Sequence, residues 1–229
     1  YTIFQNRLNK SVQFLKKVLN NEKKIIFANL SLVWSRNQKY YSDWHGNWKL
    51  DGGVLAQQGI HYIDLLNYLL GKPVKCVSNI SNKVNKLEAE DTHSALIIFK
   101  KNISCTVNMS TAFKPRDFEA SIKIYCKDKI FVLDGLCCNK IKIFDLNNNT
   151  FRFIKKYSES VPNGYGISHR YVLQGIIDHE LKKKTKYENP LKAIDALDTI
   201  RLLNMMYKSY EKNKWVKSIE KNIYSKLGN

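Results

Sequence analysis

Four polar side chains recur at helical spacing in the otherwise apolar segment "GGVLAQQGIHYIDLLNYLLG", residues 52–71. They are Gln57, His61, Asp64 and Tyr68. At about 100° per residue these positions share one stripe of a helix, while the leucines can face a core. A histidine with a pKa of about 6.5 can take a proton from a hydroxyl, and a nearby carboxylate can orient its ring. His61 and Asp64 are therefore candidates for acid–base chemistry.

A second interpretation stays open for this segment, in which His61 and Asp64 only make one edge of an amphipathic helix soluble. The glycines at 52, 53 and 59 remove side chains, so that another backbone or a ligand can approach closely. The Gly-Gly pair lacks the GxGxxG spacing and the preceding strand of a dinucleotide-binding loop. Both interpretations place the segment on a helix that ends at "GKP", residues 71–73.

The elements around this helix are those of an α+β fold. "YTIFQ" predicts a strand, "NKSVQFLKKVLN" a helix and "KKIIFANLSLVW" a second strand. Seven short segments between Val74 and Phe153 are rich in β-branched and aromatic residues, and their short turns favour antiparallel pairing. Two amphipathic helices follow, "SHRYVLQGIIDHELKKK" and "NPLKAIDALDTIRLLNMMYKSYEKN". We expect an open-faced, predominantly antiparallel mixed β-sheet with helices on one face.

The composition favours a globular protein with a lysine-rich surface. The chain has 229 residues, of which 44% are hydrophobic and 12% aromatic, which argues against disorder. Its formal net charge of +18 could serve nucleic acid or an anionic membrane surface. Only six of the 38 basic residues are arginines, however, and the lysines are spread over the whole chain. Specific nucleic-acid sites usually depend on arginine, so a nucleic-acid binder is the least favoured interpretation.

The sequence predicts neither a membrane span nor a metal site. No run of 18 or more apolar residues occurs, and the opening "YTIFQNRLNK" does not resemble a secretory signal. An odd number of cysteines without a CxxC motif predicts reduced thiols and a cytoplasmic location. These residues are Cys76, Cys105, Cys126, Cys137 and Cys138. The adjacent pair at 137–138 does not predict zinc, because a zinc site needs four converging ligands.

"DGGVLAQQGIHYIDLLNYLLGKP" resembles the signature of the glucose–fructose oxidoreductase and inositol dehydrogenase family. "QNRLN", "WHGNWKL" and "EDTHSALIIFKKNI" resemble it too, in the same order, so that the resemblance covers nearly the whole chain. In this family a Rossmann domain that binds NAD or NADP precedes an open-faced sheet domain with the substrate pocket and the oligomer contact. The resemblance implies an NAD(P)-dependent oxidoreductase that acts on a sugar. We also expect a homodimer or homotetramer through the open sheet face.

The resemblance assigns roles to three residues of the helix. His61 matches the active-site histidine, which would act as acid or base on the sugar hydroxyl while hydride moves to the nicotinamide. Asp64 matches the aspartate one turn later, which would orient His61 or bind substrate. Gln57 stands where many members carry an aspartate. An amide cannot exchange a proton at neutral pH, so Gln57 would only hydrogen-bond the substrate.

An amide at position 57 resembles the branch of the family that acts on nucleotide-linked amino-sugar acids, the UDP-N-acetylglucosaminuronate 3-dehydrogenases of surface-polysaccharide pathways. "WSRNQKYYSDWHGNW" and "GYGISHRY" resemble that branch as well. This implies Arg36, Tyr40, Tyr41 and His169 as substrate-binding residues. Each has a simpler role available: an ion pair for the arginine, packing for the tyrosines and a helix start for the histidine.

The resemblance also implies that part of the enzyme lies outside this sequence. Residues 1–22 resemble the last strand and helix of the Rossmann domain, and residues 23–229 resemble the substrate-binding and oligomerisation domain. Neither a GxGxxG motif nor the family's Glu-Lys-Pro motif occurs, so we expect no cofactor-binding residues and no turnover in this fragment alone. The alternative is a non-catalytic assembly module of the same fold without a cofactor domain.

Overall fold

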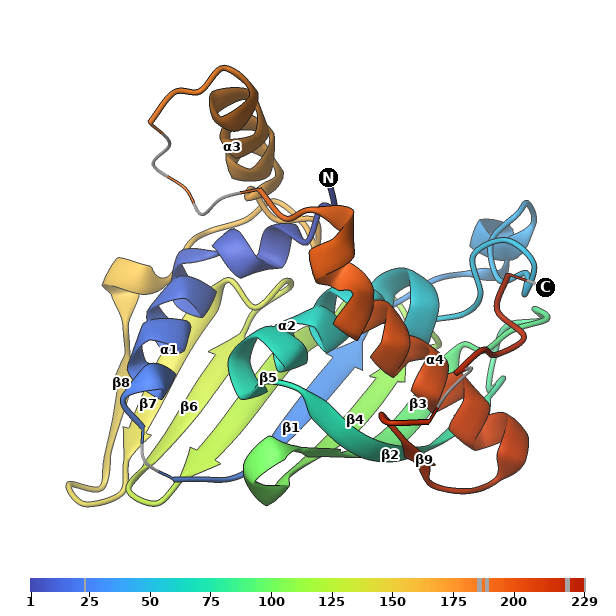
Figure 1. Cartoon of the computed structure of the whole chain (residues 1–229), viewed down its shortest axis with the longest axis horizontal. Coiled ribbons are helices and arrows are strands. Elements are labelled where there is room, and N and C mark those ends of the chain that lie inside the picture. The colour runs from blue at the N-terminus through green and yellow to red at the C-terminus, as the bar shows by residue number, and fades with distance from the viewer. Residues whose placement is uncertain (23, 185–186, 188–189, 221–222, 229) are drawn as a thin grey trace.

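The computed structural model describes the whole chain except residues 23, 185–186, 188–189, 221–222 and 229. One large sheet forms the body of the molecule, and helices α1, α2 and α4 lie across one of its faces (Figure 1). The helices are α1 (Lys10–Asn20), α2 (Ile60–Leu70), α3 (His169–Glu180) and α4 (Leu197–Lys212). Helix α3 extends beyond the edge of the sheet, so it does not take part in covering the face (Figure 1).

The described residues form a sheet of nine strands in the order β8-β7-β6-β5-β1-β4-β3-β2-β9. The strands are β1 (Ile25–Val33), β2 (Pro73–Ser81), β3 (Thr92–Phe99), β4 (Ile103–Ser110), β5 (Glu119–Cys126), β6 (Lys129–Asp134), β7 (Lys140–Asp145), β8 (Thr150–Phe153) and β9 (Val216–Lys217). Strands β1 and β4 pair in parallel, and the other neighbours pair antiparallel. The predicted mixed, predominantly antiparallel sheet is confirmed. The short strand β9 was not predicted, because two residues carry no periodic signal.

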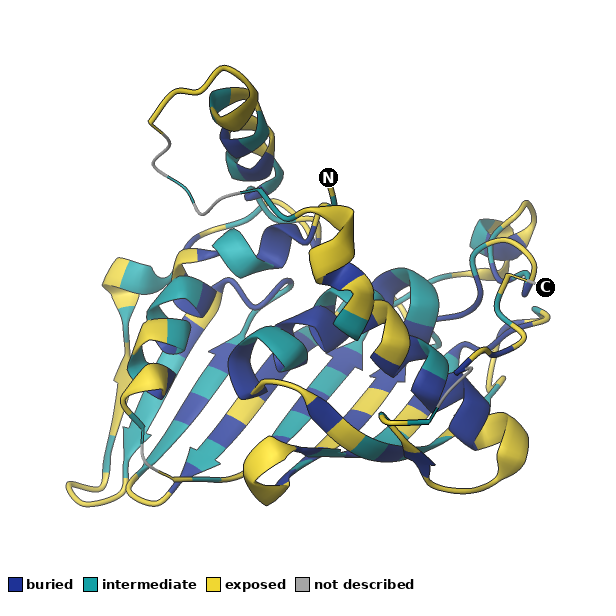
Figure 2. Ribbon diagram, viewed as in Figure 1, coloured by how far each residue is buried: buried dark blue, intermediate teal, exposed yellow. Residues whose placement is uncertain are grey.

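A single apolar core lies between the helices and the sheet (Figure 2). Val12 and Leu15 of α1, Leu66 of α2 and Met205 of α4 are fully buried in it. The strands contribute the other side of this core, because their side chains alternate between buried and exposed positions; Ile122 of β5 is one of the buried ones. Because α1 contributes to this same core, residues 10–20 pack against the sheet.

The prediction of a strand at the start of the chain is wrong. Residues 1–4 form no strand, and a 3₁₀-helix follows at Gln5–Leu8. A strand is stable only where another strand pairs with it, and here the N–H of Thr2 donates to the carbonyl of Leu191 instead, at 2.8 Å. The division of the chain at residue 22 stays a prediction.

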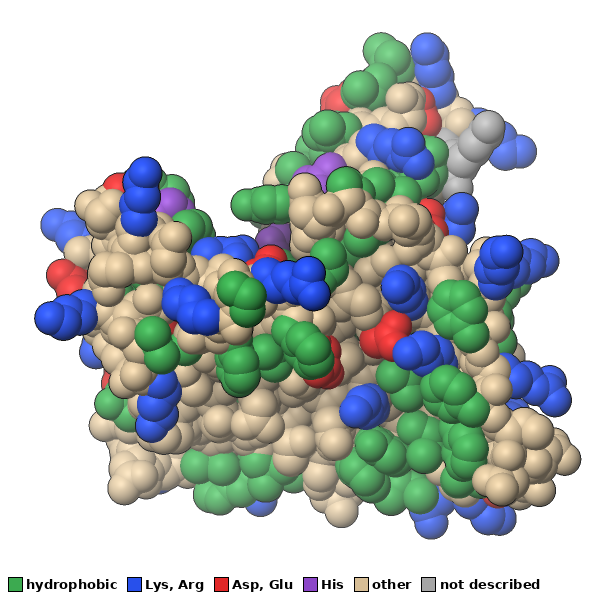
Figure 3. All heavy atoms as spheres, turned by 180° about the vertical axis from the view of Figure 1, so that it is seen from behind, with side chains coloured by type: hydrophobic (Ala, Val, Ile, Leu, Met, Phe, Trp, Pro, Cys, Tyr) green, Lys and Arg blue, Asp and Glu red, His purple; other side chains and the backbone are tan. Residues whose placement is uncertain are grey.

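The opposite face of the sheet is open among the described residues (Figure 3). Polar side chains run across its middle: Thr106 donates to Asn29 at 3.1 Å, and Ser94 donates to Asn108 at 2.8 Å. Apolar side chains gather toward its ends. No helix of the described residues covers this face (Figure 1).

Other features of the described residues concern membranes, metals and thiols. No helix among them is long and apolar enough to cross a membrane. They contain no group of three or more histidine, cysteine or acidic side chains that could hold a metal ion. The five cysteines are buried and free, and burial raises the pKa of thiols such as that of Cys105, to about 12.

Candidate active site

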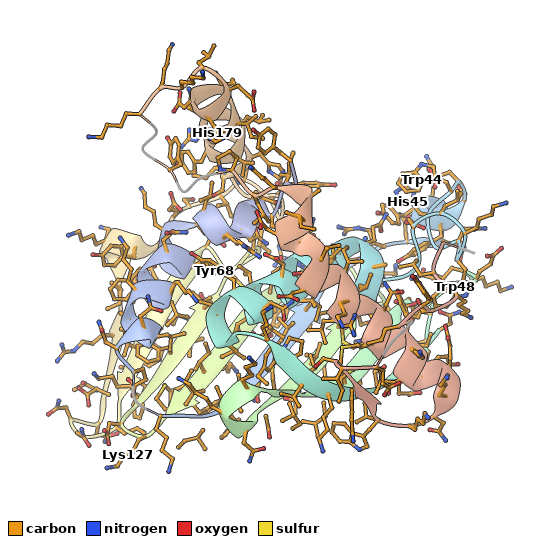
Figure 4. The ribbon with its side chains drawn as sticks, in the orientation of Figure 1. Trp44, His45, Trp48, Tyr68, Lys127 and His179 are labelled. Atoms are coloured by element: carbon orange, nitrogen blue, oxygen red, sulfur yellow. The ribbon has the colours of Figure 1, made fainter. Side chains whose placement is uncertain are left out.

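The predicted site lies at one edge of the sheet, where β1 ends and α2 begins (Figure 1). Figure 3 shows the molecule hollowed there, between the loop of residues 36–50 and the projection that carries α3, with histidine side chains beside the hollow. Figure 4 marks the two sides: Trp44 and His45, whose rings stack at 3.9 Å, stand on the loop, and His179 stands on α3. We call this hollow the cleft.

The helix that carries His61 begins with an irregular turn. Residues Leu55–Gly59 form a π-helical turn, in which the N–H of Gly59 donates to the carbonyl of Val54 at 2.7 Å, five residues back. The helix becomes α-helical only from Ile60. Because a π turn holds more residues than an α turn, Gln57 lies off the regular stripe on which it was predicted. Such turns are frequent at functional sites.

His61 is partly exposed but crowded. Its ring meets the ring of Phe4 edge-on, with centroids 6.0 Å apart, and its Nδ1 is buried without a hydrogen-bond partner among the described residues. Burial, and to a smaller degree the nearby His169, lowers the pKa of His61 to about 4. The imidazole is therefore neutral at pH 7, which leaves one ring nitrogen free to accept a proton.

Asp64 departs from its predicted role. It is completely buried, and Arg7 binds its two oxygens, from Nε at 2.7 Å and from Nη2 at 2.6 Å. Thr199 donates a further hydrogen bond at 2.9 Å. Burial raises the pKa of this carboxyl, and the bonds from Arg7 and Thr199 oppose that shift. With its oxygens so engaged, Asp64 has no hydrogen bond to His61 among the described residues and no surface for a substrate.

Three predicted substrate residues contact one another near the loop of residues 36–50. The hydroxyl of Tyr40 donates to Oε1 of Gln57 at 2.7 Å, and the neighbouring Gln58 donates to that hydroxyl at 3.2 Å. The guanidinium of Arg36 lies 5.4 Å from the centre of the Tyr40 ring and forms an ion pair with Asp117 at 3.0 Å. The structure thus brings Arg36, Tyr40 and Gln57 together, although the arginine also has the simpler role of an ion pair.

Tyr41 and Tyr68 lie elsewhere. Tyr41 is buried, its hydroxyl shares a hydrogen bond of 2.7 Å with Thr111, and burial raises its pKa to about 12. Tyr41 therefore has the simpler role of a packing residue, and this buried position does not offer the predicted contact with substrate. Tyr68 faces α1, where Gln13 donates to its hydroxyl at 3.3 Å and Arg7 lies over its ring at 5.0 Å (Figure 4).

His169 is the first residue of α3 and lies near enough to His61 to affect the charge of its ring. The preceding residue fixes this position, because the Ser168 hydroxyl donates to Asn9 at 2.7 Å. Asn9 in turn donates to the carbonyl of Cys137, also at 2.7 Å. The structure therefore brings the two histidines together from segments that are far apart in the sequence.

Sequence reasoning missed Tyr165 and Trp34. Tyr165 is exposed and lies near Tyr40. Burial is the main cause of the raised pKa of Tyr40, Arg36 opposes that shift, and Tyr165 adds a smaller increase. Trp34 directly follows β1, and a Cβ added to Gly164 would lie 2.8 Å from its ring. The glycine and tyrosine of "GYG" were a usable signal, because a glycine beside an aromatic residue often marks a close approach.

Together the fold and the cleft define an α+β domain that carries a neutral histidine and several aromatic and polar groups where β1 ends and α2 begins. A model of the C-terminal α/β domain of an oxidoreductase family matches residues 16–218. The chain belongs to this family, that of the glucose–fructose oxidoreductases and inositol dehydrogenases. No curated protein sequence matches the chain.

Solved structures share this fold. The WlbA dehydrogenase of Bordetella pertussis, in complex with NADH and UDP-GlcNAcA, is 24% identical with a TM-score of 0.78 over 94% of this chain. The corresponding enzyme of Chromobacterium violaceum, with the same ligands, is 25% identical with a TM-score of 0.79 over 95%. A levoglucosan dehydrogenase in complex with NADH and L-sorbose is 14% identical with a TM-score of 0.78 over 95%. This chain spans 62% of the two WlbA chains and 65% of the third.

Proposed function

We propose that this chain is the substrate-binding and oligomerisation part of an NAD(P)-dependent oxidoreductase that oxidises a hydroxyl of a nucleotide-linked amino-sugar acid. The observation that carries the proposal is the neutral, partly exposed imidazole of His61, on the same helix as Gln57, which accepts a hydrogen bond from Tyr40 next to Arg36. The similarity to two dehydrogenases in complex with UDP-GlcNAcA supports this choice of substrate class.

In this proposal His61 accepts the proton of the sugar hydroxyl. A base works best when its pKa is near the operating pH, and burial lowers the pKa of His61 to about 4. A carboxylate on the sugar would place a negative charge near the ring and raise that pKa toward neutrality. An acidic sugar would thus activate its own base, and Arg36 would pair with the negative charge of the ligand.

The oxidant in this proposal is NAD or NADP. The described residues do not by themselves fit a dinucleotide, because no GxGxxG loop occurs in the sequence. We therefore derive only the proton transfer from this chain. The proposal also keeps a cytoplasmic role in surface-polysaccharide synthesis and assembly into a homodimer or homotetramer through the open sheet face.

The first test is the effect of His61→Asn. In a protein that joins these 229 residues to a dinucleotide-binding domain, NADH formation from UDP-N-acetylglucosaminuronate should fall at least a hundredfold. Binding of the sugar, measured by calorimetry, should change little, because asparagine keeps a polar group in place. Residues 1–229 alone should not form NADH.

Lys127→Asn serves as the control, because Lys127 is exposed in a turn far from the cleft (Figure 4) and its replacement should leave turnover unchanged. Turnover that survives His61→Asn, or turnover by residues 1–229 alone, would contradict the proposal. Binding of the sugar without turnover in any assembled form would favour the non-catalytic assembly module.

A further inference from the structure

The side chain of Phe4 lies against the candidate base. Its ring meets the His61 ring edge-on, with centroids 6.0 Å apart, and only 7% of Phe4 is exposed. Such edge-on pairs of rings are attractive contacts with a preferred geometry. Phe4 has no polar side-chain atoms, so this contact removes water from part of the imidazole without offering a hydrogen bond in its place.

A second contact joins the same two segments. Arg7 stands three residues after Phe4, which precedes the 3₁₀-helix Gln5–Leu8, and Asp64 stands three residues after His61 in α2. Nε and Nη2 of Arg7 donate to the Asp64 carboxylate at 2.7 and 2.6 Å. Residues three apart lie on one side of a 3₁₀-helix and of an α-helix. Phe4 and Arg7 therefore meet His61 and Asp64 as two matched contacts.

The ion pair also fixes the position of Phe4. The N–H of Arg7 donates to the carbonyl of Phe4 at 3.1 Å, and the guanidinium lies 5.9 Å from the centre of the Phe4 ring. Thr199 of α4 donates to Asp64 at 2.9 Å, so the carboxylate that receives Arg7 is itself held in place. Because Asp64 is completely buried, a displaced Arg7 would leave an unpaired buried charge, which is costly.

Water has more influence on the charge of His61 than its charged neighbours do. Burial is the main cause that lowers the pKa of His61 to about 4, and His169 at the start of α3 adds a smaller effect. Arg7 brings a positive charge from the 3₁₀-helix, but Asp64 offsets it within the ion pair. A side chain that shields the imidazole from water, as Phe4 does, therefore controls how readily the imidazole takes a proton.

Building on the proposed function, we propose that Phe4 is a positioning residue for the base: held by the Arg7–Asp64 pair, it fixes the direction of the His61 ring and shields that ring from water. The shield keeps the imidazole neutral until a ligand brings negative charge to it. Asp64 then supports His61 indirectly, because it holds the segment that carries Phe4.

The test follows the imidazole signal of His61 by NMR while the pH of the 229-residue protein is changed. The spectrum of His61→Asn identifies the signal. The unchanged protein should show a pKa of about 4 for His61. Phe4→Ala opens the ring to water and should raise this pKa by about one unit, a tenfold change in the acid dissociation constant. Phe4→Val leaves part of the shield, so it should shift the pKa in the same direction by about half as much and serves where the alanine variant does not fold.

Phe14→Ala is the matched control, because Phe14 lies on α1, where its ring stacks on that of Tyr157 at 4.2 Å, and its loss should not move the titration. A purely structural role of Phe4 would lower turnover at every pH. In a protein joined to a dinucleotide-binding domain, the proposal instead expects the acid limb of kcat/KM to move to higher pH together with the NMR titration.

A pKa of His61 near 6.5 in the unchanged protein would overturn the inference. So would a pKa that Phe4→Ala leaves in place or lowers. In both cases the proposed function would stand as long as His61→Asn still abolishes turnover. Turnover that survives His61→Asn would overturn the proposed function and this inference together.

Discussion

At the scale of single residues, Glu90 shows how burial sets the charge of a side chain. It is completely buried, and its Oε1 accepts from the N–H of Leu55 at 3.0 Å and from the hydroxyl of Tyr207 at 2.9 Å. Burial raises its pKa from 4.5 to about 8, although these bonds oppose the shift. Glu90 is therefore protonated at neutral pH while it holds the start of the helix that carries His61.

Glu90→Gln should change how stability depends on pH. Because the pKa of Glu90 is higher in the folded than in the unfolded protein, its contribution to stability is complete below pH 4.5 and is lost as the pH rises to about 8. Glutamine does not ionise. Relative to the unchanged protein, the free energy of unfolding of the variant should therefore rise by up to about 1.4 kcal/mol per pH unit across this range.

Urea unfolding at pH 5, 7 and 8.5, followed by circular dichroism, would measure the difference. The exposed Glu211→Gln is a control that should run parallel to the unchanged protein. A difference between Glu90→Gln and the unchanged protein that does not grow with pH would contradict the assignment.

At the scale of elements, the start of α2 shows why glycines stand in an apolar helix. A Cβ added to Gly53 would lie 2.3 Å from the carbonyl oxygen of Glu90, and one added to Gly59 would lie 2.5 Å from Sδ of Met109. These close neighbours belong to β4 and to the segment just before β3. The glycines therefore let the helix start approach the sheet, which is how the cleft comes to adjoin His61.

The two glycines should differ in their tolerance of alanine. Gly53→Ala meets backbone that cannot move aside, so we expect a loss of about 3 kcal/mol in the free energy of unfolding. Gly59→Ala mainly meets the flexible end of a methionine and should cost about 1–2 kcal/mol. Chemical denaturation of both variants would measure the order. A smaller loss for Gly53→Ala than for Gly59→Ala would contradict this account of the helix start.

At the scale of the whole molecule, one face of the sheet is not covered by any helix of the described residues (Figure 3). Polar residues such as Thr106 and Asn108 occupy its middle, and Phe27 stacks on Tyr125 at 4.1 Å toward one side. A face with both polar pairs and exposed aromatic rings suits contact with a second copy better than contact with solvent alone.

If this face is the proposed oligomer contact, a lysine placed in its middle should separate the subunits. Asn108→Lys would bury an unpaired charge between two copies, and the loss of affinity between subunits should be at least a hundredfold. Asn147→Lys, in an exposed turn at the far edge of the sheet, is the control with the same change of charge. Light scattering would report the mass. A monomeric unchanged protein, or an oligomer that survives Asn108→Lys, would contradict the proposal.

Much of the fold followed from local patterns. Alternation of apolar residues predicted strands β1 to β8, and the short turns between them predicted antiparallel pairing, because these signals depend only on neighbours in the sequence. The prediction for the first residues failed, since "YTIFQ" has strand-forming residues but no strand among the described residues pairs with it. Propensity describes what a segment can form, and a partner decides what it does form.

By itself the sequence predicted strands β1 to β8, the class of fold and the placement of His61 on a helix, because all three depend on local periodicity and residue chemistry. Only the tertiary structure decided the partners of the polar groups. Asp64 is bound by Arg7, which is 57 residues away in the chain, and it has no hydrogen bond to His61 among the described residues. The π turn arises where the helix start meets the sheet. Contacts between segments that are distant in the sequence produce no local periodicity, so no sequence pattern could have predicted them.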